Sequence, residues 1–211
     1  MDMELINHLK WRYATKKFDP DRGVSPTDLE TLKEAIHLSV SSYGLQLYKV
    51  LIIEDQAIRK ELKRVSWDQD QVTDASHLFV FCNHTRVDPE EIDAFIRLTS
   101  QKRKIDLEKL EGYASFMKAK LAEKSMTETR NWLERQPYLA LGNLLMACAA
   151  LKIDACPMEG FEPGAYNKIL GLDEQGLNAC VVAAVGYRHP EDRSKDLPKV
   201  RKPMEALFEE V

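Results

Sequence analysis

Three short apolar runs, far apart in the chain, constrain the fold more than any other feature of the sequence. They cover residues 47–53, 78–82 and 180–185, and in each of them apolar residues stand at odd and even positions alike. A strand with apolar side chains on both faces is expected in a sheet that is covered on both sides. The sequence therefore predicts a small central sheet between layers of helices.

Helical patterns fill most of the chain between these runs. Leu5, Ile6 and Leu9 indicate a short amphipathic helix, and Ser25, followed by Pro26 and Asp28, is expected to cap a second one. The resulting fold class is α+β and rich in helices. Further helices are expected over residues 56–65, 88–122 and 128–151, with Pro137 as a kink or a break in the last.

Size and charge limit the class of protein. A chain of 211 residues suits one compact domain spanning residues 1–211, and no repeat or flexible linker divides it. The net charge of −4 and the lack of a basic stripe argue against binding to nucleic acid. The segment 88–125 is the least apolar part of the chain, so it is expected at the periphery or over a site.

The expected cellular compartment follows from the lack of a secretory signal, a membrane span and paired cysteines. The N-terminus has no basic and then apolar secretory signal, and the apolar run 138–151 is too short for a membrane span. The four cysteines show no CxxC spacing, which indicates a reduced, cytoplasmic protein without a structural metal site.

Familiar catalytic and nucleotide-binding motifs are absent as well. The sequence has no GxSxG, no HExxH, no GxGxxG and no P-loop, and its five histidines lack ligand spacing. Three scattered segments remain as candidates. Residues 12–20 carry Arg12 and Lys16, residues 155–161 (ACPMEGF) suggest a turn that could aim backbone amides at a ligand, and residues 197–203 carry Lys199 and Arg201 between two prolines. Taken singly, each has a plainer interpretation as solvated surface or loop.

Together and in this order, these segments resemble the FMN-dependent nitroreductase family, in particular the bacterial oxygen-insensitive NAD(P)H nitroreductases. The resemblance rests on RYATKKFD, SSYGLQ, TDASHLFVFC, WLERQPYLALGNLLMACAAL, PMEGF and LPKVRKP, which follow one another over nearly the whole chain. It implies a mostly antiparallel central sheet flanked by helices, and a homodimer whose C-terminal tails are exchanged.

The resemblance also implies a cofactor site for FMN, with NAD(P)H as reductant and no catalytic side chain of its own. Arg12, Lys199 and Arg201 would hold the phosphate, and Lys16 would reach the pyrimidine edge of the flavin. The backbone amides of Glu159 and Gly160 would lie near flavin N5. The other residues implied at the cofactor are Tyr13, Ala14, Val40, Ser41, Ser42, Asp68, Gln71, Pro157 and Met158.

Three aromatic residues are candidates to contact the substrate. Tyr43, Tyr113 and Phe116 are candidates to lie above the flavin, although an aromatic residue in a helix such as 108–122 is more often part of the core.

The sequence also departs from the family pattern at two of these positions near the flavin. Asp68 stands where relatives often have Asn, and Gln71 where some have Lys, so the redox properties of the flavin are expected to differ.

The expected function is reduction of nitroaromatics or quinones, which are flat, electron-poor acceptors, by a ping-pong cycle through flavin N5. Three alternatives stay open at this point. One is another reaction of the flavin superfamily, such as reductive dehalogenation, enoyl-type dehydrogenation or flavin fragmentation. The others are a non-catalytic flavin-binding protein and an interaction protein without a cofactor.

Overall fold

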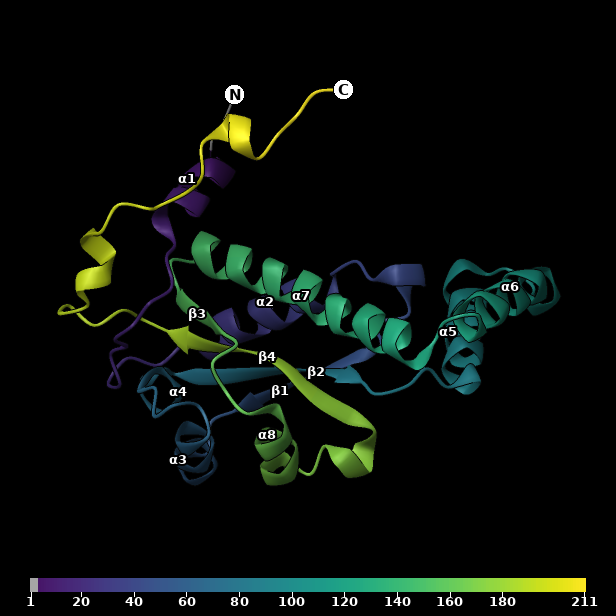
Figure 1. Cartoon of the computed structure of the whole chain (residues 1–211), viewed down its shortest axis with the longest axis horizontal. Helices are drawn as coiled ribbons and strands as arrows, with labels where there is room; N and C mark the ends of the chain where they lie inside the picture. Colours follow the sequence, from purple (N-terminus) through teal and green to yellow (C-terminus); the bar gives the residue numbers. More distant parts are fainter. Residues whose placement is uncertain (1–3) are drawn as a thin grey trace.

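The computed structural model describes residues 4–211 and has a four-stranded, fully antiparallel sheet at its centre (Figure 1). The strand order is β1-β2-β4-β3, so the two strands buried deepest, β2 and β4, lie in the middle. The expected α+β class and the antiparallel sheet are confirmed. The strands are β1 (Tyr48–Ile53), β2 (His77–His84), β3 (Asp154–Met158) and β4 (Leu177–Gly186).

Helices cover both faces of this sheet (Figure 1). On one face, alternate residues of β2 and β4 such as Phe79 and Val181 pack with helices α2 and α7. On the other face, Leu78 and Val182 pack with α3, α4 and α8. The strands have apolar residues at odd and even positions alike because each face of the sheet packs into its own core. The helices are α1 (Glu4–Trp11), α2 (Pro26–His37), α3 (Gln56–Arg64), α4 (Gln71–Asp74), α5 (Pro89–Arg103), α6 (Glu111–Ala122), α7 (Met126–Ala150) and α8 (Pro163–Leu170).

Most of the expected local structure is confirmed. The Ser25 hydroxyl accepts a hydrogen bond from the Asp28 amide at 3.1 Å and caps α2. The helical segment 88–122 is confirmed and consists of two helices, α5 and α6, with a 3-10 turn, Leu107–Leu110, between them. One expectation is wrong, because residues 155–158 belong to strand β3 rather than to a turn. The alternative of a break at Pro137 is also wrong, because α7 continues through it.

Helices α5 and α6 form an arm that projects from the body (Figure 1). The arm has a small core of its own, in which Ile92, Ile96 and Met117 are buried. It meets the body where Phe95 and Trp132 pack with the turn around Tyr43. The expectation that this segment lies at the periphery is confirmed.

Two buried aspartates anchor the segment that follows α1. Asp154 in β3 accepts from the Thr15 hydroxyl at 3.3 Å, and Ala14 forms a parallel bridge to Ala155. Asp192, which is 3% exposed, accepts from the Lys16 amide at 2.9 Å and the Tyr13 hydroxyl at 3.1 Å. The backbone from Tyr13 to Lys16 is therefore held between β3 and the start of the C-terminal tail.

The charge of Asp192 is part of this anchor. Burial alone would raise the pKa of Asp192, but hydrogen bonds from the backbone amides of Lys16, Ser194 and Lys17 outweigh it and leave the pKa below its usual 3.8. A carboxylate with a lowered pKa stabilises the fold above the pKa of the unfolded chain, and the stabilisation is lost as pH falls through the folded value.

We therefore expect Asp192→Asn to lower the free energy of unfolding by about 1–3 kcal/mol at neutral pH, since a carboxamide cannot replace a carboxylate that accepts from several donors. The difference from the wild type should shrink below about pH 4. Urea unfolding between pH 2 and 7 measures it, with the exposed Asp196→Asn as control. A difference that stays constant down to pH 2 would contradict the role given to the charge.

Candidate functional site

Three cations from the two ends of the chain come together in one place. Burial, and then repulsion from Arg201, lower the pKa of Arg12. Removal from water, and then repulsion from Arg12, Arg201 and Arg188, lower the pKa of Lys199, although its side chain remains largely exposed. The structure thus brings together the three residues that the sequence predicted to bind a phosphate, although they lie nearly 190 positions apart.

No acid among the described residues 4–211 pairs with this cluster. Within residues 4–211, Arg12, Lys199 and Arg201 form no ion pair, whereas the neighbouring Arg188 donates from Nε to Asp154 at 2.8 Å. Like charges held together without an acid destabilise the fold, and an anion between them would remove the repulsion. A guanidinium fork matches two oxygens of a phosphate, so a phosphate monoester is the anion that suits this group best.

Lys16 and Gln71 lie beside the same strand, at the buried thiol of Cys156. Burial raises the pKa of Cys156, while Lys16, Arg12 and the Gln71 side chain lower it in part, so all three are close to the sulfur. Cys156 is 1% exposed, and it immediately precedes Pro157 and Met158. These predicted residues therefore surround the end of β3, next to the cation cluster.

The turn after β3 presents two unused backbone donors. Within residues 4–211, the amides of Glu159 and Gly160 donate to no acceptor, while the Gly160 carbonyl accepts from Gln69 Nε2 at 2.8 Å. Free amides on a turn that is held in place can donate to an acceptor atom of a ligand. The sequence placed this turn correctly at Glu159 and Gly160, although it extended the turn too far back into β3.

The loop 66–70 lies against this turn and holds it. Trp67 and Asp68 both adopt left-handed backbone angles, with φ of 54° and 52°. A Cβ added at Gly160 would come within 2.7 Å of the Trp67 ring, so this contact requires glycine. Asp68 is exposed and Gln71 is buried at the start of α4. Both are near the end of β3.

The other half of the predicted cofactor site lies elsewhere in the chain. The Ser42 amide donates to Gln136 Oε1 at 2.8 Å, and Gln136 lies twelve positions before Cys148, which is close to Arg12. Twelve residues span about 18 Å of helix. The Glu159 turn bonds to Tyr138, which is two positions from Gln136. Residues two positions apart point to different sides of a helix, so Ser42 and the Glu159 turn lie on different sides of α7. One chain therefore does not bring Val40, Ser41 and Ser42 to the cations.

The three predicted substrate residues also lie apart from the cations. Tyr43 packs with Trp132, with 6.4 Å between ring centroids, where the arm meets the body. Tyr113 and Phe116 lie on α6 in the arm and are 44% and 49% exposed. Figure 1 shows the arm at the opposite end of the molecule from α1 and the tail.

Several residues at this site were missed by sequence analysis. Trp67 and Gln69 hold the Gly160 turn, Gln136 holds Ser42, and Tyr138 bonds to Glu159. No motif marks them, because each acts through a contact made across a long stretch of chain. The signal that could have found Trp67 is an isolated large aromatic residue in a polar loop, directly before the predicted Asp68.

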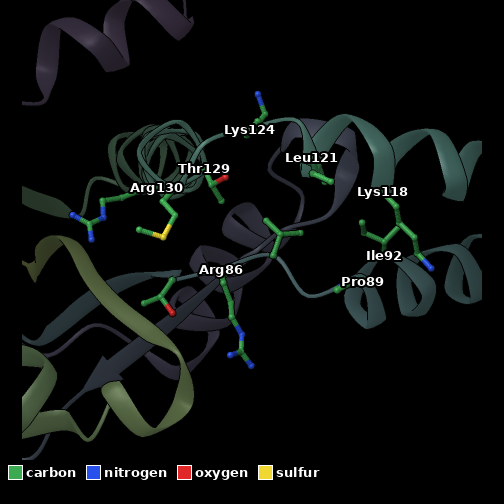
Figure 2. Close-up of a pocket in the computed structure, with 12 residues that line it drawn as sticks. Arg86, Pro89, Ile92, Lys118, Leu121, Lys124, Thr129 and Arg130 are labelled. Carbon is green, nitrogen blue, oxygen red and sulfur yellow. The ribbon is translucent and has the colours of Figure 1, made fainter.

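A pocket at the base of the arm does not coincide with these residues. It has a volume of about 380 Å³ and lies between the segments that leave and re-enter the body (Figure 2). Val87, Ile92 and Leu121 contribute apolar walls, and the charged ends of Arg86, Lys118 and Lys124 point outward. None of the predicted cofactor residues lines it. The cation cluster is instead an open surface, which suits a site completed by another chain.

Two further findings concern metals and membranes. In the part of the chain that the structure describes, no three His, Cys, Asp or Glu side chains gather as metal ligands would. No helix from residue 4 onward is both long and apolar enough to cross a bilayer.

Comparison with known proteins shows the family of the chain. The major NAD(P)H-flavin oxidoreductase of Aliivibrio fischeri is 34% identical over 215 residues, which cover 99% of each chain. The oxygen-insensitive NAD(P)H nitroreductase of Salmonella typhimurium is 29% identical over 226 residues, or 99% of this chain and 100% of the relative. A protein of Exiguobacterium sibiricum, crystallised in complex with FMN, has the same fold, with a TM-score of 0.82 at 16% identity over 100% of this chain and 98% of that one. The nitroreductase family model matches residues 9–187. The chain belongs to the nitroreductase family.

Proposed function

We propose that this protein is a homodimeric, FMN-dependent NAD(P)H oxidoreductase that reduces nitroaromatics or quinones by a ping-pong cycle, with the whole chain 1–211 as one domain. The observation that carries the proposal is the group of Arg12, Lys199 and Arg201, which pairs with no acid among residues 4–211 and lies near a turn with two free amides. The names of the relatives support the reductant and the flavin. The four free cysteines suit a reducing, cytoplasmic compartment.

The residues of one chain fit the parts of FMN. Arg12, Lys199 and Arg201 would hold the phosphate, with Tyr13 and Ala14 beside it, and Asp68 and Gln71 would meet the ribityl chain or the pyrimidine edge. Lys16 would stabilise negative charge at that edge. Pro157, Met158 and the amides of Glu159 and Gly160 would lie at the reactive side of the ring. When bound, FMN supplies the redox chemistry, taking hydride from NAD(P)H and passing it to the acceptor.

The homodimer follows from the division of the site. Val40, Ser41 and Ser42 lie about three turns of α7 away from the cations, yet Val40 is 73% exposed. We propose that this turn packs on the flavin held by the cations of the other subunit. Small side chains at Ser41 and Ser42 allow close approach of backbone to the ring.

Exchange of the C-terminal tail would complete the dimer. The end of the tail, residues 204–211, exposes apolar side chains, with Met204 at 70% and Phe208 at 66%, and its charged side chains are Glu205, Glu209 and Glu210. Strand β1 has an open edge, and the groove of about 430 Å³ beside it is lined by apolar residues and by Lys33, His37 and Lys49. An acidic and apolar segment complements that groove in charge and in polarity, so we place the tail of the partner there.

The acceptor would enter above the flavin, beneath an arm. Tyr113 and Phe116 are exposed on α6 and lie far from the cations of their own chain, so in a dimer they would reach the site of the partner. Tyr43 would act at the base of the arm, where it packs with Trp132. Flat, electron-poor rings such as nitroaromatics and quinones stack well against such side chains.

The function is tested by mixing the FMN-loaded protein anaerobically with NADH or NADPH and recording flavin absorbance. We expect the flavin to bleach with at least one nucleotide, and its colour to return on adding nitrofurazone or menadione. Bound flavin that neither nucleotide reduces would indicate a non-catalytic flavin-binding protein. Reduction without turnover of either acceptor would indicate another reaction of the superfamily.

The phosphate assignment predicts opposite effects on binding and on stability. We expect Arg201→Gln to weaken FMN binding at least about tenfold, because one charged contact is lost. The same change should leave the flavin-free protein as stable as the wild type or up to about 0.5 kcal/mol more stable, since repulsion is relieved. Fluorescence titration and urea unfolding measure the two effects, with Arg22→Gln, which only loses a contact to Tyr187, as control. Unchanged FMN affinity would refute the assignment.

Tail exchange predicts that ending the chain at Pro203 shifts the protein from dimer to monomer, because the apolar residues beyond it are lost. FMN should be lost with the dimer, even though Lys199 and Arg201 remain. Light scattering coupled to gel filtration and the visible spectrum report the two outcomes. Phe208→Ser should also weaken the dimer, but less. Ile58→Ser, on α3 and outside the groove beside β1, should leave the dimer unchanged. A shortened chain that stays dimeric at low concentration would contradict the exchange.

A further inference from the structure

A single hydrogen bond ties the side chain of Glu159 to the long helix α7. The Tyr138 hydroxyl donates to Glu159 Oε1 at 2.6 Å, across 21 positions of sequence. No other hydrogen bond reaches this carboxylate from residues 4–211. Glu159 is exposed on one subunit, while Tyr138 is partly buried, so surrounding packing does not fix the position of the carboxylate.

The remaining braces of the turn act on its backbone. Gln69 donates to the Gly160 carbonyl, and the Phe161 amide donates to the Glu159 carbonyl at 2.9 Å. The Trp67 ring lies against the Cα of Gly160 and leaves no room for a side chain there. None of these contacts limits rotation of the Glu159 side chain. The orientation of its negative charge therefore depends on Tyr138.

The phenol is suited to this task. Burial, and then the hydrogen bond to Glu159, raise the pKa of Tyr138. The hydroxyl therefore keeps its proton throughout the physiological range and always donates. A hydrogen bond from a neutral donor to a charged acceptor is among the stronger contacts that an exposed side chain can make.

The position of this charge matters because Glu159 also carries one of the two free amides. A carboxylate that turned toward a bound ring would disfavour the additional negative charge that the ring takes up on reduction. A carboxylate held on α7 leaves the amides as the groups that face the ring.

We infer that Tyr138 is a positioning residue, which holds the Glu159 carboxylate on α7 and so keeps its charge away from the flavin. In its redox part this inference rests on the proposed function. In its structural part it concerns the protein without flavin. The two parts can therefore be tested separately.

The structural part is tested in the flavin-free protein by side-chain NMR couplings of Glu159, which report its rotamers. In Tyr138→Phe, which keeps the ring and removes the donor, the Glu159 side chain should average over several rotamers instead of holding one. Tyr187→Phe is the matched control, because the Tyr187 hydroxyl makes no hydrogen bond within residues 4–211 and its ring stacks on Arg22. An unchanged Glu159 rotamer in Tyr138→Phe would overturn the inference.

The redox part is tested by the midpoint potential of bound FMN in a double-mutant cycle. Tyr138→Phe should lower the equilibrium constant for two-electron reduction about tenfold, a shift of about 30 mV to more negative potential. The effect should vanish in a Glu159→Gln background, where no charge remains to be released. FMN affinity should change less than about twofold, because the phosphate contacts are untouched.

The possible outcomes separate this inference from the proposed function. An equal shift with and without the Glu159→Gln change would mean that Tyr138 acts by packing, and would overturn the inference while the function stands. A wild-type protein that takes up no FMN would overturn the proposed function and the redox part together. The rotamer of Glu159 would then still decide whether Tyr138 holds the carboxylate.

Discussion

Mutual repulsion among Arg12, Lys199 and Arg201 is the constraint on which the rest of the structure depends. A fold gains nothing by gathering like charges at its surface, so the arrangement has to be held by other contacts. The buried Asp154 and Asp192 supply them, because they fix the segment after α1 against β3 and against the start of the tail. The cations are therefore prepared for an anion before it arrives, which lowers the entropic cost of binding it.

The long helix α7 divides the molecule into two incomplete halves. The cations lie near its C-terminal end, the Glu159 turn and the Ser42 turn meet it near its middle on different sides, and the arm lies toward its N-terminal end. Neither half encloses a planar ring by itself, and the pocket of the arm is apart from both. Two copies related by a two-fold axis would join unlike halves twice, which is the simplest way for one sequence to build two equal sites.

The turn after β3 shows how precise placement is achieved with few special residues. Two consecutive left-handed residues, Trp67 and Asp68, bring the loop against Gly160, and Gln69 then bonds to its carbonyl. The strained backbone is tolerated because the Trp67 ring and the Gln69 amide gain these contacts. What remains free on the turn is a pair of amide donors, together with one carboxylate held by Tyr138.

The sequence by itself determined the layered fold and the chemical character of the site. Apolar residues at odd and even positions alike predict the central strands, and Ser25 predicts a helix start. The order of the motifs, including the cations at both chain ends, indicates the family. Local patterns have these consequences because periodicity and capping act over a few residues.

Tertiary structure alone decided where these residues meet. Residues 155–158 form a strand in spite of Pro157, since β3 lies at the edge of the sheet, where an absent amide hydrogen needs no partner. The contacts of Trp67 with Gly160 and of Tyr138 with Glu159 join residues 93 and 21 positions apart, respectively. The separation of Ser42 from the cations along α7 is likewise invisible in the sequence. Such contacts depend on how whole elements pack, and no local pattern encodes the packing partner.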